Sequence, residues 1–148
     1  MSTTAATSTA ALTTLTTLTT EDKNTLRTAA YGAVSLLAAA DATGSPHKVA
    51  THGTLALNAA TGPIGHVLAE KSKIKGLYGK STADLADHVL PALTAAMALL
   101  SEQVPAEAAN FRSIVTVAVD AATQARKGAP SPAVAAMIRK INGALDVA

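Results

Sequence analysis

Alanine dominates the apolar part of this chain and limits which secondary structure it can form. Hydrophobic residues make up 49% of the 148 residues, yet aromatic residues amount to only 2% and tryptophan is absent. Alanine is the strongest helix former and is depleted in strands, so this composition favours closely packed helices. No stretch of the sequence alternates β-branched or aromatic residues with polar ones as strands do. The sequence therefore predicts an all-α fold.

Capping residues, prolines and glycines divide the chain into helical segments. Apolar residues recur at helical spacing in six segments: 20–41, 46–60, about 63–72, 81–102, 105–128 and 131–145. The fourth segment contains Pro91, which removes one backbone hydrogen bond, so we expect a kink near Asp87 or a break into two helices. Helices with short connections usually pack as antiparallel neighbours. We therefore expect a single-domain bundle of five or six helices.

The first 19 residues differ from the rest of the chain. They are almost entirely Ser, Thr, Ala and Leu, and leucine recurs every third residue in the segment 12–20. Threonine is a weak helix former, and a spacing of three drifts around an α-helix instead of forming a stripe. We therefore expect a flexible Thr/Ala-rich tail over residues 1–19 and a helical bundle domain over residues 20–148.

Charge and cysteine content narrow the class of protein. The formal net charge of +2 is too small to favour nucleic acid or a membrane surface as the partner of the whole chain. The absence of cysteine excludes disulfides and thiolate chemistry. The uncharged segment 89–100 is shorter than the roughly 18 residues of a membrane span, and no secretory signal pattern precedes Lys23. These features lead us to expect a soluble, cytoplasmic protein.

Two histidine–carboxylate pairs are candidates for a metal or acid–base site. His66 and Glu70 are four residues apart, as are Asp84 and His88, so each pair would share one helix face. With His52, such pairs on facing helices could hold a divalent metal or a small ligand inside the bundle. The pattern departs from the Glu-x-x-His motif of di-metal carboxylate proteins, and ordinary surface ion pairs explain the same residues. No cofactor is predicted beyond this candidate.

The lysine-rich segment 71–81, which leads into the fourth helix, is a candidate anion site. It lacks a helical period and leads into a helix N-terminus, where free N–H groups and the helix dipole favour an anion. Its last three residues match the end of the P-loop pattern, but Ile74 replaces the first glycine and no strand precedes it. Solvation of a loop explains the same lysines. The candidate anion-binding residues are Lys71, Lys73, Lys75, Gly79, Lys80 and Ser81.

Function follows from what these patterns leave open. The chain has no cysteine nucleophile and no G-x-S-x-G elbow, so no catalytic residue is assigned and an enzyme is disfavoured. Apolar residues lie off the main stripe in two segments, at Leu90, Leu99, Val117 and Val119. A central, doubly buried position or a dimer interface would explain them. The leading interpretation is a small non-enzymatic helical protein acting through protein contacts, as a homo-oligomer or with a protein partner.

Overall fold

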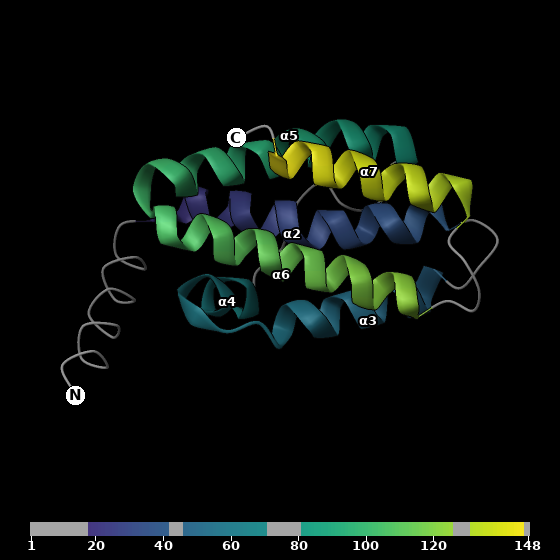
Figure 1. The fold of residues 1–148 in the computed structure, drawn as a ribbon, viewed down its shortest axis with the longest axis horizontal. Helices are drawn as coiled ribbons and strands as arrows, with labels where there is room; N and C mark the ends of the chain where they lie inside the picture. The colour runs from purple at the N-terminus through teal and green to yellow at the C-terminus, as the bar shows by residue number, and fades with distance from the viewer. Residues whose placement is uncertain (1–17, 42–45, 71–80, 126–130, 147–148) are drawn as a thin grey trace.

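Six α-helices make up the described part of the chain, which comprises residues 18–41, 46–70, 81–125 and 131–146 of a computed structural model (Figure 1). In chain order the helices are α2 (Thr20–Ala40), α3 (Pro46–Asn58), α4 (Gly62–Ala69), α5 (Thr82–Gln103), α6 (Pro105–Gln124) and α7 (Pro132–Asp146). These ranges contain no strand. The predicted all-α bundle is therefore confirmed. The predicted tail lies outside the described residues, except for Leu18 and Thr19.

Three of the helices begin where side chains cap their free backbone N–H groups. The Thr19 hydroxyl accepts a hydrogen bond from the Asp22 amide at 3.0 Å, and the Asp22 carboxylate accepts one from the Thr19 amide at 3.1 Å. This capping box, through the bond from the Thr19 backbone, lowers the pKa of Asp22. The Ser81 hydroxyl caps α5 by accepting from the Asp84 amide at 3.1 Å. Ser131 caps α7 in the same way through the Val134 amide at 3.3 Å.

Two helices end earlier than the sequence predicts. Helix α4 ends at Ala69 instead of near residue 72, because Glu70 adopts an extended backbone with φ −62° and ψ 132°. Helix α6 ends at Gln124, and the expected end at residue 128 lies outside the described residues. Helix α5, in contrast, continues through Pro91 as one helix, so of the two expected alternatives, a kink or a break, the break is excluded. Pro91 is exposed. Water can therefore hydrate the Asp87 carbonyl that loses its N–H partner.

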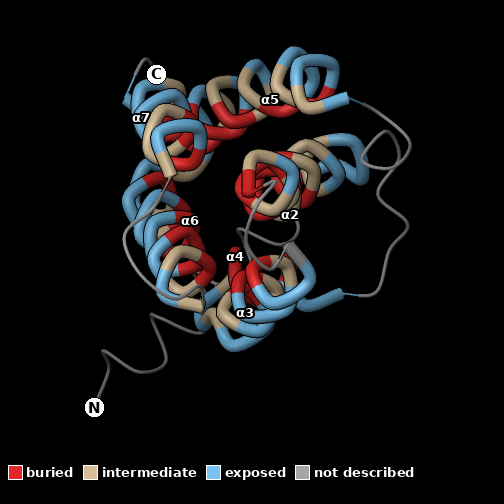
Figure 2. Tube along the Cα trace, turned by 90° about the vertical axis from the view of Figure 1, so that its right-hand side faces the viewer, coloured by how far each residue is buried: buried red, intermediate tan, exposed pale blue. Residues whose placement is uncertain are grey.

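Helix α2 occupies the centre of the bundle. Figure 2 shows it between α5 on one side and α3 on the other, with α6 closing the bundle beside them. A central position and a dimer interface both remain explanations of the off-stripe apolar residues in α5 and α6. Leu90 and Leu99 are half-buried at the edge of the core, Val119 is buried, and Val117 is exposed.

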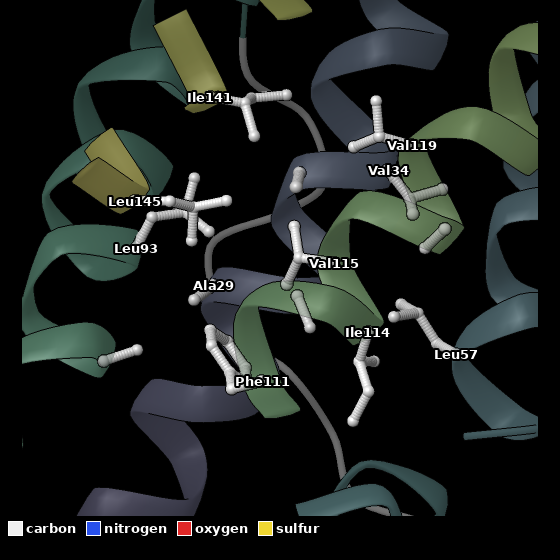
Figure 3. Packing of buried hydrophobic residues seen from close by; sticks show 14 of the residues in the cluster. Ala29, Val34, Leu57, Leu93, Phe111, Ile114, Val115, Val119, Ile141 and Leu145 are labelled. Atoms are coloured by element: carbon white, nitrogen blue, oxygen red, sulfur yellow. The ribbon is translucent and has the colours of Figure 1, made fainter. Parts of the chain in front are cut away.

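One hydrophobic cluster fills the space around α2. Figure 3 shows side chains from α2, α3, α5, α6 and α7 converging in it, with Phe111 of α6 among the largest that are fully buried. Glycines allow two close contacts between helices. A Cβ atom at Gly32 would lie 2.5 Å from Cγ2 of Val89, and one at Gly53 would lie 2.6 Å from Cγ1 of Val34. Val89 and Val34 therefore fill the space that a side chain larger than glycine would need at positions 32 and 53.

Candidate functional site

A buried arginine, Arg27, joins α2 to the C-terminal end of α4. Its side chain is 7% exposed, and Nε donates a hydrogen bond to the Val67 carbonyl at 3.0 Å. One terminal nitrogen donates to the Glu70 carboxylate at 2.5 Å, and the other donates to the Asn24 side chain at 3.1 Å. The last carbonyls of a helix have no partner within that helix. Arg27 therefore acts as a cap for α4 from a neighbouring helix.

Tyr31 supports the same helix end from one turn further along α2. Its hydroxyl lies 2.6 Å from the Leu68 carbonyl, to which it donates, and 3.0 Å from Oδ1 of Asn58 at the end of α3. Burial raises the pKa of Tyr31, and the nearby positive charge of Arg27 opposes this shift to a smaller extent. Helices α2, α3 and α4 therefore meet at one polar junction.

The outer edge of this junction is an ion pair open to solvent. Glu70 is 39% exposed, and its second carboxylate oxygen lies 3.8 Å from Nε2 of His66, one turn earlier in the chain. The predicted proximity of His66 and Glu70 is therefore confirmed. We call Arg27, Tyr31, Asn58, His66 and Glu70 the Arg27 cluster. Its buried polar groups are satisfied by the contacts that fasten α4, which is a structural task.

The other candidate metal or acid–base residues lie apart from this cluster. His52 is exposed on α3, and Asp84 and His88 are exposed on α5. The described ranges contain no group of three or more His, Asp or Glu residues that could hold a metal ion. Within the same ranges no ion pair joins Asp84 to His88, although both belong to α5. The metal site remains a prediction for which the structure brings together only His66 and Glu70.

The candidate anion site lies almost wholly outside the described residues. This applies to Lys71, Lys73, Lys75, Gly79 and Lys80. Ser81 is described, and its hydroxyl is engaged in capping α5. The anion-binding interpretation therefore also remains a prediction.

Helix α5 turns its large apolar side chains toward the core and exposes mainly small, polar or charged residues. It is the one helix in the described part of the chain that is long and apolar enough to cross a membrane, a criterion that core helices of soluble proteins also meet. In that stretch 33% of the residues are buried, and the exposed ones include Pro91, Ala95 and Ala98. Two large apolar side chains are exposed on other helices: Leu55 of α3 is 59% exposed and Val117 of α6 is 58% exposed. The described surface therefore offers apolar area on three helices.

The sequence carries one signal for the Arg27 cluster that helical periodicity does not reveal. Arg27 is the only charged residue between Lys23 and Asp41, in a segment otherwise suited to burial. A charged residue within an apolar helix is buried only when it is paired, so such a position indicates partners elsewhere in the chain. The partners, Val67 and Glu70, are 40 and 43 residues away.

Comparison of the chain with protein-family models, curated proteins and solved structures found no match.

Proposed function

We propose that this chain is a small non-enzymatic helical protein that acts through protein contacts, in the first place with copies of itself. The observation that supports this proposal is apolar area on outer helix faces: Leu55 of α3 is 59% exposed, and Pro91, Ala95 and Ala98 give α5 a small uncharged face in solvent. Apolar surface left in solvent favours association, because burying it releases water.

The Arg27 cluster agrees with this proposal. Arg27 and Tyr31 each donate a hydrogen bond to a backbone carbonyl at the end of α4. A group with this arrangement stabilises a surface and is not poised to move a proton to a substrate. The cluster therefore supports a rigid scaffold on which outer helix faces can be presented.

Sedimentation velocity on the full-length chain tests the proposal. We expect the average sedimentation coefficient to rise as the protein concentration increases, because association by modest apolar surfaces is a mass-action equilibrium. A sedimentation coefficient that stays at the value of the monomer from about 10 μM to about 1 mM would contradict the proposal. Self-association with a dissociation constant above this range would have only a small binding free energy.

A further inference from the structure

The outer face of α3 carries a stripe with one lysine, one histidine and one large apolar side chain. Lys48, His52 and Leu55 are exposed and follow one another at spacings of four and three residues, so they lie along one side of the helix. Helix α3 contains no acidic residue, and Leu55 is 59% exposed. This stripe presents a large apolar side chain about two helical turns from the positive charge of Lys48.

The outer face of α5 has the opposite character. Its exposed residues follow one another at spacings of four and three, and they are Asp84, His88, Pro91, Ala95, Ala98 and Glu102, with Asp87 beside them. The middle of this face is small and uncharged, and carboxylates stand at both ends. Helix α5 contains neither lysine nor arginine. It therefore presents a shallow apolar surface that is bordered by negative charge.

These two faces cannot meet within one molecule. Figures 1 and 2 show α3 and α5 on opposite sides of α2, and the residues of both stripes are exposed. A contact between them requires two copies of the chain, each using a different surface. Such a contact is heterologous, so it leaves one α3 face and one α5 face free for further copies.

We propose that the outer face of α3 in one copy docks on the outer face of α5 in the next. Leu55 then packs on the small residues around Ala95, and Lys48 lies beside the carboxylates at one end of α5. This inference rests on the proposed function, and it identifies both the partner and the surfaces. Pairing of like faces is disfavoured, because two α5 faces would bring Asp84, Asp87 and Glu102 against their own kind.

The size of the two faces sets the expected strength. Helix α3 has 13 residues, which corresponds to a length of about 20 Å at 1.5 Å per residue. One pair of helices of this length buries less than the roughly 1,200 Å² at which stable interfaces begin. The assembly is therefore weak and strongly dependent on concentration.

Two variants that each destroy one face test the pairing. Leu55→Glu adds negative charge to the α3 face, and Ala95→Glu adds it to the small surface of α5. Val117→Glu is the matched control, because Val117 is as exposed as Leu55 but lies on α6. All three positions are exposed, so we expect the helical circular dichroism of the full-length chain to be unchanged in each variant.

Sedimentation velocity then compares the proteins singly and mixed. We expect wild type and Val117→Glu to form a series of oligomers, and each face variant alone to associate at least about tenfold more weakly. An equimolar mixture of Leu55→Glu and Ala95→Glu should form one-to-one pairs and stop there, because only one intact α3 face and one intact α5 face remain for each pair.

Other outcomes would overturn the pairing. If the mixture stays monomeric while wild type associates, or if neither face variant weakens association, the copies use other surfaces and only this inference fails. If wild type itself stays monomeric at every concentration, the proposed function fails together with it.

Discussion

Burial distinguishes the two arginines that meet carboxylates in the described part of the chain. The Arg27 side chain is 7% exposed and pairs with Glu70, whereas the Arg112 side chain is 46% exposed and pairs with Asp146 at the end of α7. Breaking a buried pair leaves polar groups without partners, whereas exposed pairs are replaced by water at little cost. The position of each arginine therefore decides its contribution to stability.

Substitution of each arginine by methionine tests this difference. We expect Arg27→Met to lower the free energy of unfolding by about 2–3 kcal/mol, because the Val67 carbonyl loses its donor and Glu70 loses its partner. The matched variant Arg112→Met should lower it by less than about 1 kcal/mol. Urea unfolding followed by circular dichroism gives both values. Equal losses in the two variants would show that Arg27 is not the cap of α4.

Tyr31 makes stability sensitive to alkaline pH. Its pKa in the folded state is raised, chiefly by burial, above the ordinary value of about 10. The protonated phenol is thus favoured by folding, so its contribution is complete below the unfolded pKa and is lost as the pH rises through the folded pKa. Tyr31→Phe removes both the hydrogen bond to the Leu68 carbonyl and this titration.

The prediction for Tyr31 concerns the difference in the free energy of unfolding between wild type and Tyr31→Phe. At neutral pH the variant should be less stable than wild type by about 1 kcal/mol, the usual contribution of one hydrogen bond. The difference in the free energy of unfolding between wild type and Tyr31→Phe should become smaller above about pH 10. Urea unfolding of both proteins at neutral pH and above about pH 10 measures this difference in the free energy of unfolding. The contributions of groups that titrate in both proteins cancel in the difference. A gap that widens at alkaline pH would contradict a raised Tyr31 pKa.

At the scale of helices, close approach explains why α2 holds the centre. Gly32 admits Val89 of α5, and Val34 enters the space left by Gly53 of α3. Both contacts use α2, one toward each of its neighbours. Replacing either glycine would force the helices apart, because the neighbouring valine is buried and rigid at χ1.

A pair of glycine substitutions separates packing from helix propensity. Gly32→Ala should lower the free energy of unfolding by about 1–2 kcal/mol, because the overpacking at Val89 exceeds the gain in propensity. Gly143→Ala on α7 is the control, since a Cβ atom there meets nothing within 4 Å. It should raise stability by about 0.5–1 kcal/mol. Thermal unfolding reports both, and a stabilising Gly32→Ala would contradict the tight contact between α2 and α5.

Local signals predicted the helix starts, and tertiary contacts decided what the sequence did not reveal. Thr19, Ser81 and Ser131 cap α2, α5 and α7 through amides three residues ahead, so these starts are encoded in neighbouring residues. The end of α4 lies where Glu70 meets Arg27, a partner 43 residues away. The central place of α2 likewise depends on contacts with all five other helices of the described chain. Neither can be read from periodicity alone.

At the scale of the whole molecule, charge separates two opposite faces. Lys48 is exposed on α3, which has no acidic residue, and Asp84, Asp87 and Glu102 are exposed on α5. If copies join through these faces, added salt should weaken the assembly, because screening shortens the reach of the charges from about 10 Å at 0.1 M to about 3 Å at 1 M. Sedimentation velocity at the two salt concentrations measures the change. Assembly that strengthens with salt would indicate a contact governed by apolar area alone.

Native mass spectrometry of the full-length chain tests the central claim most directly, because one spectrum reports both the assembly and any bound metal or small molecule. The account predicts species at whole multiples of the chain mass, whose share grows with protein concentration and which carry no additional mass. A single monomeric species at all concentrations would contradict it, and a monomer that retains a metal ion would favour the histidines and carboxylates as its ligands instead.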